Sequence, residues 1–374
     1  MALYLDYCAS TPIDPRVLEA MVDIYQNKPG NADSRTHVFG QQAKEVVNTS
    51  RRKIAQILGI DPTEVIFTSG ATESDNTAII GLMNYGITSG KKHIVTTAIE
   101  HKAVLEAVRY LEKQGFAVDY VKPDEKGRIH SEDVLKLVRD DTVLVSIMHV
   151  NNETGVIQPV EEIGEALSSR GTIFHVDAAQ SFGKLNDDLR ALKYDMLSIS
   201  GHKIHGPQGI GALILKRKAY KRPPVEPLLH GGQQEYGFRP GTTPVALVVG
   251  FAVAAEIMEK EYPTLIGALQ EQKDNLISAL TPYDVQINGD LDYSLPNVLN
   301  FSIPNVDAEA FFAAQKDVYA ISNGSACTSG SYKPSYVLQA MGYDEKRISE
   351  ALRVSWWTKP FETESMIRYI RNVL

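Results

Sequence analysis

Short apolar runs alternate with longer amphipathic stretches from about residue 64 to residue 216. Runs of this length are typical of buried strands, and the stretches between them are long enough to form helices. This alternation predicts an α/β domain with a mostly parallel sheet. The runs are Val65–Thr68, His93–Thr97, Ala117–Val121, Val143–Met148, Thr172–Val176, Met196–Ile199 and Ala212–Leu215.

The pattern changes after this region. Helical spacing of apolar residues dominates from Val245 to about Leu280, and short apolar runs reappear at Leu299–Ile303 and Ala351–Ser355 between helical stretches. Mixed strands and helices without regular alternation predict a second, smaller α+β domain. A chain of 374 residues also exceeds the size at which one hydrophobic core stops growing, which favours two domains.

Composition excludes several classes of protein. With 43% hydrophobic and 22% charged residues the chain is typical of globular proteins, and its net charge of -8 disfavours binding to nucleic acid or anionic membranes. The longest apolar run, Pro244–Ala255, is too short to span a bilayer. The start of the chain lacks the charged and apolar regions of a secretory signal, so we expect a cytoplasmic protein with no membrane partner.

Lys203 is the first candidate for chemistry. It lies between a strand-like run and a glycine-rich turn in the segment Ser198–Leu215. Most lysines are ordinary surface residues, but a desolvated lysine is suited to form a Schiff base with an aldehyde. The upstream run Phe174–Ser181 contains Asp177, and pyridoxal phosphate enzymes pair their lysine with an acid that protonates the pyridine nitrogen. We therefore expect both residues in one site.

A candidate anion site lies at Phe67–Ser74, where a strand, a turn of small residues and a helix start follow one another. Other motif matches are weak. The glycines of Gly206–Gly211 do not have the nicotinamide-binding order, and Ser200–Lys203 matches the S-x-x-K motif of β-lactamases without the K-T-G that accompanies it. His202 and His205 have no further ligands nearby in the sequence, so no metal site is expected.

The chain has two cysteines, Cys8 and Cys327, which are too few for a disulfide framework. Cys8 lies in an aromatic and aliphatic segment, and we expect it to be buried and inert. Cys327 lies in the polar, glycine-containing run Ser322–Ser331, which predicts an exposed loop. An exposed thiol on such a loop is a candidate nucleophile.

Together these motifs resemble a known family, the class V, fold-type I pyridoxal phosphate enzymes, and within it the NifS/IscS-like cysteine desulfurases. The resemblance runs nearly end to end. It rests on Tyr4–Tyr7, Thr68–Ser74, Glu100–Lys102, Asn151–Gly155, His175–Ser181, Ser200–Lys203, Arg239–Thr242, Gly324–Ser329 and Leu352–Ser355. It implies a large cofactor-binding domain of residues 15–260 with a seven-stranded sheet, and a small domain of residues 1–14 and 261–374.

The resemblance also implies roles toward pyridoxal phosphate. Lys203 would hold the cofactor covalently and then carry a proton, and His101 would stack on the ring and serve in acid–base steps. Asp177 would keep the pyridine nitrogen protonated, while Gln180 would bond the phenolic oxygen. The implied phosphate and neighbouring contacts are Ala71, Thr72, Ser200, His202 and, from the other subunit of a homodimer, Thr242.

For the substrate, the resemblance implies that Asn152 and Arg353 bind the carboxylate of L-cysteine. Cys327 would take the sulfur as a persulfide, leaving L-alanine, and pass it to an acceptor protein. The pathway stays open among iron–sulfur cluster assembly, tRNA thiolation, cofactor synthesis and DNA phosphorothioation.

Two alternatives remain at this point. Another class V aminotransferase or lyase would use the same lysine but would not need a cysteine on a polar loop. A catalytically idle homologue could act as a dimeric scaffold in sulfur transfer, although the presence of Lys203, Asp177, Cys327 and Arg353 disfavours this reading.

Overall fold

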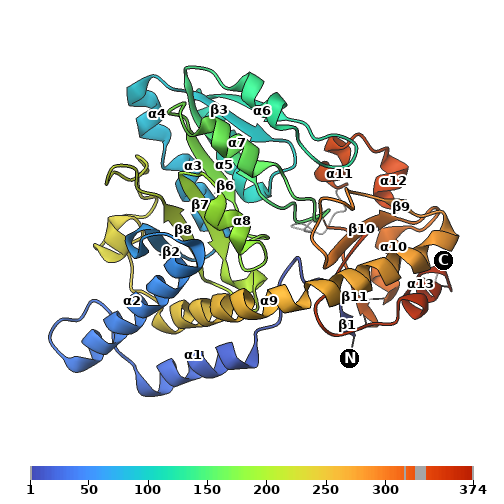
Figure 1. Cartoon of the computed structure of the whole chain (residues 1–374), viewed down its shortest axis with the longest axis horizontal. Coiled ribbons are helices and arrows are strands. Elements are labelled where there is room, and N and C mark those ends of the chain that lie inside the picture. The colour runs from blue at the N-terminus through green and yellow to red at the C-terminus, as the bar shows by residue number, and fades with distance from the viewer. Residues whose placement is uncertain (1, 316, 325–333, 373–374) are drawn as a thin grey trace.

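A computed structural model describes residues 2–315, 317–324 and 334–372. Its largest element is a seven-stranded sheet in the order β2-β8-β7-β6-β5-β3-β4, in which β8 alone runs against its neighbours (Figure 1). The strands are β2 (Val65–Thr68), β3 (His93–Thr97), β4 (Ala117–Val121), β5 (Thr142–Met148), β6 (Ile173–Asp177), β7 (Met196–Ser200) and β8 (Gly211–Leu215). Each predicted run matches a strand to within one residue, so the predicted α/β class with a mostly parallel sheet is confirmed.

Both faces of this sheet are covered, which explains why most of its strands are buried along their whole length and rich in apolar residues; the edge strand β4 is partly exposed. Along β8, Ala212 and Ile214 join one buried cluster, whereas Leu213 and Leu215 join another. Helices α3 and α5 contribute to the second cluster; α2, α7, α8 and α9 contribute to the first. The helices of this part are α1 (Pro15–Asn27), α2 (Val38–Leu58), α3 (Ala71–Ile80), α4 (Met83–Ser89), α5 (Lys102–Lys113), α6 (Ser131–Leu137), α7 (Val160–Leu167) and α8 (Asn186–Ala191).

Helix α9 (Val245–Leu280) has 36 residues and matches the predicted helical stretch. It runs along the base of the molecule from the large sheet to the C-terminal part (Figure 1). The predicted boundary between domains at residue 260 falls inside this helix, so the division into 15–260 and the remainder stays a prediction.

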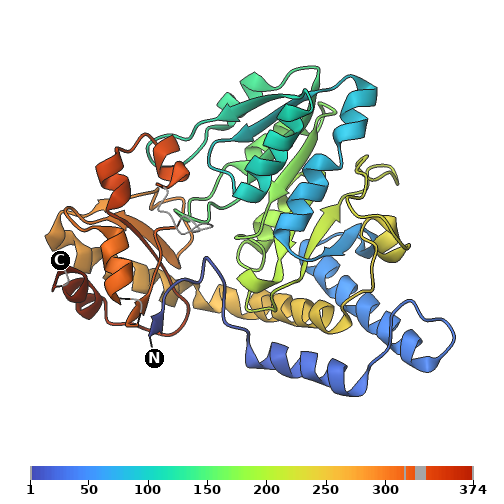
Figure 2. The ribbon, with the colours of Figure 1, turned by 180° about the vertical axis from the view of Figure 1, so that it is seen from behind.

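The C-terminal part is α+β, as predicted. It contains an antiparallel sheet in the order β12-β10-β9 and a parallel pair that joins β1 to β11, so the N-terminal strand lies against the last third of the chain (Figure 2). Its elements are β1 (Leu3–Tyr4), β9 (Gln286–Ile287), β10 (Val298–Ser302), β11 (Tyr319–Ala320), β12 (Ala351–Ser355), α10 (Ala308–Gln315), α11 (Tyr336–Ala340), α12 (Glu345–Ser349) and α13 (Thr363–Asn372).

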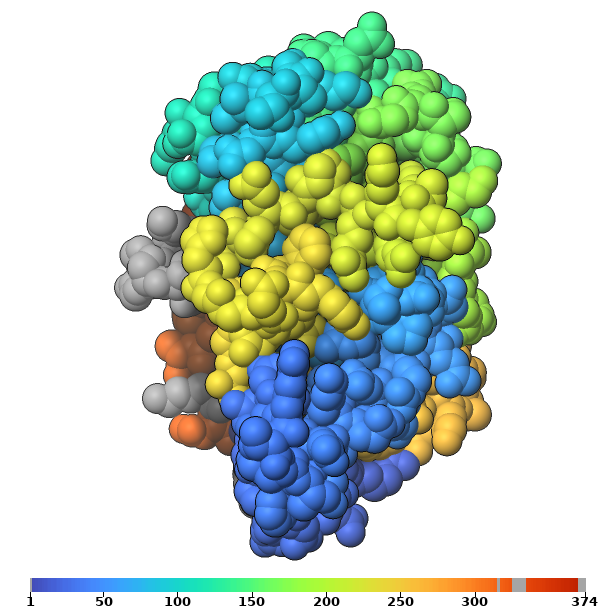
Figure 3. All heavy atoms as spheres, turned by 90° about the vertical axis from the view of Figure 1, so that its left-hand side faces the viewer, coloured from blue at the N-terminus to red at the C-terminus, as the bar shows by residue number. Residues whose placement is uncertain are grey.

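Helices α1 and α2 and the segment of residues 216–244 lie next to one another on one face of the molecule (Figure 3). Large apolar side chains are exposed there; on α1, Leu18, Val22 and Tyr25 are 48%, 39% and 66% exposed. Within the described residues, no helix is both long and apolar enough to cross a membrane.

Candidate active site

A cavity of about 820 Å³ is lined by the last residues of β5, β6 and β7 together with residues of the N-terminal segment and of the C-terminal part. Ligands of α/β proteins commonly bind at this edge of the sheet. Of the predicted site residues, the cavity is lined by Ala71, Thr72, His101, Asn152, Asp177, Gln180, Ser200, His202, Lys203 and Arg353. Thr242 is exposed and does not line it, and Cys327 lies outside the described residues.

Lys203 ends a 3-10 turn that follows β7. The turn is tight, because a Cβ on Gly201 would lie 2.9 Å from Ile210 Cγ2, so this position requires glycine. The Lys203 ammonium donates to the carbonyl oxygens of Cys8 at 2.7 Å and Ala9 at 2.8 Å. Burial lowers the pKa of Lys203 to about 8, so about a tenth of this amine is neutral at pH 7, far more than for an exposed lysine.

Asp177 is the last residue of β6 and lies on the floor of the cavity. One of its oxygens accepts a hydrogen bond from the backbone N–H of Ala179 at 2.8 Å. Burial raises the pKa of Asp177, because a carboxylate loses its hydration there. A cationic ligand group placed against this acid would restore the ionised form.

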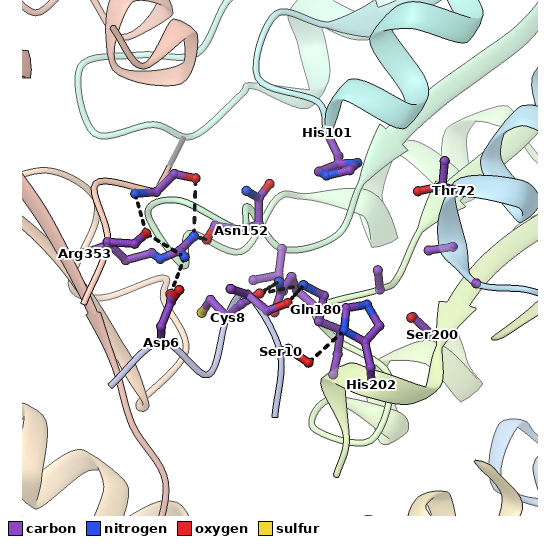
Figure 4. Close-up of a pocket in the computed structure, with 18 of the residues that line it drawn as sticks. Asp6, Cys8, Ser10, Thr72, His101, Asn152, Gln180, Ser200, His202 and Arg353 are labelled. Carbon is purple, nitrogen blue, oxygen red and sulfur yellow. Dashed lines mark hydrogen bonds and ion pairs between the residues drawn. The ribbon is translucent and has the colours of Figure 1, made fainter. Parts of the chain in front are cut away.

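His101 stands above the cavity at the start of α5 (Figure 4). Its Nδ1 accepts a hydrogen bond from the backbone N–H of Ala103 at 3.2 Å, so the neutral ring carries its proton on Nε2. Burial lowers the pKa of His101, which favours that neutral ring. A flat neutral imidazole facing a cavity is suited to stack on an aromatic ligand.

The strand-to-helix turn at Ser69–Thr72 lines one end of the cavity and opens α3. Gly211 packs against this turn so closely that a Cβ there would lie 2.7 Å from Gly70 Cα. The first N–H groups of α3 have no partners within the helix and form an anion site. His202 lies nearby with a pKa lowered to about 4 by burial, and its ring nitrogen Nδ1 lies 3.3 Å from Ser10 Oγ.

Four buried polar atoms of residues that line the cavity have no hydrogen-bond partner in the described structure: Asn152 Oδ1, Gln180 Oε1, Ser200 Oγ and Arg353 Nε. The Gln180 side chain donates one N–H to the carbonyl of Cys8 at 2.8 Å, which leaves a second N–H free as well. Unpartnered buried polar groups cost about 1–3 kcal/mol each. These atoms therefore indicate a site built for a polar ligand with several hydrogen-bonding groups.

Arg353 reaches the other end of the cavity from β12 and is 3% exposed. Its guanidinium donates to the carbonyl of Asn152 at 2.8 Å and to the Asp6 carboxylate at 2.5 Å (Figure 4). A buried guanidinium at a cavity wall is suited to bind a carboxylate.

The contribution of the N-terminal segment to the site was not predicted from the sequence. Asp6, Cys8 and Ser10 all line the cavity, and Cys8 is buried, as predicted. The signal for Asp6 was present in the motif Tyr4–Tyr7, but nothing in that motif shows that it meets Arg353.

Comparisons with known proteins identify the family of this chain. The family described as aminotransferase class-V matches residues 3–359. The cysteine desulfurase IscS of Klebsiella pneumoniae is 47% identical, over 100% of this chain and 92% of the relative. The cysteine desulfurase IscS of Escherichia coli K12 is also 47% identical, over 99% of this chain and 91% of the relative.

Solved structures give the same result. A NifS-like protein aligns with a TM-score of 0.89 and 38% identity, covering 100% of this chain and 98% of the other. DndA from Streptomyces lividans aligns with a TM-score of 0.83 and 46% identity, covering 95% of this chain and 99% of the other. The chain therefore belongs to the class V aminotransferase family, whose enzymes work with pyridoxal phosphate. Within that family it is a cysteine desulfurase of the IscS and NifS type, and its substrate is L-cysteine.

Proposed function

We propose that the cavity around Lys203 is the site where sulfur is removed from L-cysteine. The convergence of a partly buried lysine, a buried acid, a histidine suited to stacking and a buried guanidinium on one cavity supports this assignment. The unpartnered Gln180 and Ser200 atoms fit pyridoxal phosphate, which carries polar groups around a flat ring.

Lys203 would hold pyridoxal phosphate covalently, with His101 over the ring and Asp177 against the pyridine nitrogen. The Gln180 amide would bond the phenolic oxygen. The phosphate would lie at the N-terminus of α3, among Ala71, Thr72, Ser200 and His202, with Thr242 supplied by a second subunit. When bound, pyridoxal phosphate supplies an electron sink for charge on the substrate's α-carbon.

Lys203 is suited to move protons once the substrate occupies the site. Its pKa of about 8, lowered by burial, allows the amine both to accept and to return a proton near neutral pH. Arg353 would fix the substrate's carboxylate, with Asn152 beside it, so the α-carbon is oriented toward Lys203.

Cys327 would accept the sulfur. Its thiolate attacks the substrate's sulfur, an S–S bond forms, and the substrate's C–S bond breaks. The electron pair of that bond stays with the carbon fragment, which takes up a proton and leaves as L-alanine. The persulfide on Cys327 then delivers its sulfur to an acceptor protein. We also expect a cytoplasmic enzyme, because thiol-based transfer requires a reducing compartment.

The direct test combines the purified holoenzyme with L-cysteine and a reducing thiol and measures L-alanine and sulfide. Equal amounts of both products support the proposal. Pyruvate as the product would indicate a lyase, and a requirement for a keto acid would indicate an aminotransferase. The absence of turnover would indicate a scaffold. Lys203→Ala should abolish turnover, whereas Lys216→Ala, on a half-buried lysine outside the cavity, should retain it.

We further propose that the active unit is a homodimer formed through the face of α1, α2 and residues 216–244. Leu18, Val22 and Tyr25 recur at helical spacing on α1, and Phe39 at the start of α2 is 50% exposed. A face with so many exposed apolar residues is typical of a subunit interface.

Light scattering coupled to size-exclusion chromatography tests this interface. Leu18→Glu combined with Tyr25→Glu should give monomers with little activity, since Thr242 would no longer reach the other subunit's phosphate. Ile266→Glu, at a residue of α9 that is 43% exposed elsewhere on the molecule, should leave the dimer intact. A fully active monomer would contradict the proposal.

A further inference from the structure

Both terminal nitrogens of the Arg353 guanidinium are engaged within the protein, whereas its Nε has no hydrogen-bond partner among the described residues. One terminal nitrogen, Nη1, lies 2.8 Å from the carbonyl oxygen of Asn152 and 3.5 Å from that of Gly324. The other, Nη2, lies 2.5 Å from Asp6 Oδ1 and 3.0 Å from Ser322 Oγ. Each terminal nitrogen carries two N–H groups, so all four already point at acceptors. A substrate carboxylate that contacts the guanidinium at two nitrogens must use at least one terminal nitrogen, and it must therefore displace a partner there.

Asp6 is the partner most similar to that carboxylate, and the backbone holds it in place. Asp6 forms an isolated parallel bridge with Ser355, two residues after Arg353. The N–H of Ser355 donates to the carbonyl of Leu5 at 2.9 Å, and the N–H of Cys8 donates to Ser355 Oγ at 2.9 Å. The contact between Asp6 and Arg353 is therefore built into the pairing of the N-terminal segment with β12.

We infer that Asp6 sets the affinity for the amino-acid substrate by competing with its carboxylate for Arg353. This inference rests on the proposed role of Arg353. The Asp6 carboxylate neutralises a cation that is 3% exposed, and an unpaired cation there would be costly. The binding free energy that the substrate gains at Arg353 is therefore only the difference between the energy of its own contact and that of the Asp6 contact it replaces.

The geometry allows the exchange. Asp6 lines the cavity, and its side chain is 21% exposed, so water can solvate the carboxylate when the substrate takes its place. Arg353 keeps its bond to the Asn152 carbonyl, which holds the guanidinium in position throughout.

A purely positioning role for Asp6 predicts the opposite change in substrate affinity when the Asp6 carboxylate is removed. If the carboxylate only orients Arg353, its loss should weaken binding of the substrate's carboxylate. If it competes, its loss should strengthen that binding. Asp6→Asn separates the two roles, because asparagine keeps the shape and an acceptor oxygen but lacks the charge.

The test titrates holoenzyme with L-alanine, the product, and with ethylamine, which lacks the carboxylate, and follows the absorbance of the bound cofactor. Asp6→Asn should bind L-alanine about fivefold more tightly, since a neutral hydrogen bond is weaker than a charge-assisted one. Ethylamine binding should not change. Asp6→Ser, a second neutral variant, should shift L-alanine binding in the same direction. Unchanged or weaker L-alanine binding in both variants would overturn the inference.

Two controls complete the design. Asp14→Asn makes the same change on an acid of the N-terminal segment that pairs with Arg16 at 2.7 Å outside the cavity, and it should have no effect. A similar tightening in this variant would overturn the inference, because it would reflect net charge alone. Arg353→Ala should lose the preference for L-alanine over ethylamine; if it keeps that preference, the role proposed for Arg353 itself fails.

Discussion

Lys203 is expected to destabilise the protein in the absence of cofactor, and replacing it with methionine should reveal the cost. Burial lowers the pKa of Lys203 from 10.5 to about 8. The unfolded chain then binds more protons than the folded chain between these two values, so the stability of the wild-type protein rises as the pH increases through this window. Below pH 8 the penalty is constant, and above pH 10.5 it disappears.

The size of the effect follows from that shift. A change of about 2.5 pH units corresponds to about 3 kcal/mol at pH 7 and, by the same linkage, about 1 kcal/mol at pH 10. Methionine also removes two hydrogen bonds, but the Cys8 carbonyl keeps its bond from Gln180, and the Ala9 carbonyl belongs to an exposed residue that water can reach. The net gain for Lys203→Met should therefore be about 2–3 kcal/mol at pH 7.

Urea unfolding of the apoprotein, followed by tryptophan fluorescence at pH 7 and pH 10, measures this difference. The variant should be more stable at pH 7, and its advantage should shrink at pH 10. Lys44→Met, at an exposed position of α2, should show a small and pH-independent effect. A less stable Lys203→Met variant, or an advantage that does not change with pH, would refute the reasoning.

Three further variants test the chemistry. Arg353→Ala should keep the absorbance of the bound cofactor but lower kcat/KM for L-cysteine by a factor corresponding to about 2–5 kcal/mol, the usual cost of truncating one partner of a desolvated charge pair; loss of cofactor with unchanged cysteine affinity would contradict this role. Cys327→Ser should abolish persulfide and alanine formation while L-cysteine still changes the cofactor spectrum, whereas Cys8→Ala should retain turnover. A persulfide located on Cys8 by mass spectrometry would contradict the mechanism.

Most of the fold was predictable because its signals are local. A strand buried on both faces must be apolar throughout, and runs such as Val65–Thr68 and Ala212–Leu215 therefore marked the large sheet to within one residue. The order of the strands was not predictable in the same way. Pairings such as β2 with β8 join segments separated by more than 140 residues and depend on packing.

The residues of the candidate site show the same difference between local signals and long-range contacts. Lys203, Asp177 and the turn before α3 were found because each lies at the end of a strand, where a short motif shows both the chemistry and its position. Asp6 was not recognised as part of the site, since its role depends on a contact with Arg353, 347 residues away.

The sequence by itself determined the class of fold, the family and the residue types available for catalysis, because these depend on local pattern and motif order. Only the tertiary structure decided the state of those residues. Burial brings the pKa of Lys203 to about 8, raises that of Asp177, and leaves polar atoms of Gln180 and Ser200 without partners. The packing of the chain also pairs Arg353 with the Asp6 carboxylate before a substrate binds. Desolvation and charge pairing depend on every element that surrounds a group, so they are fixed only once the whole chain is packed.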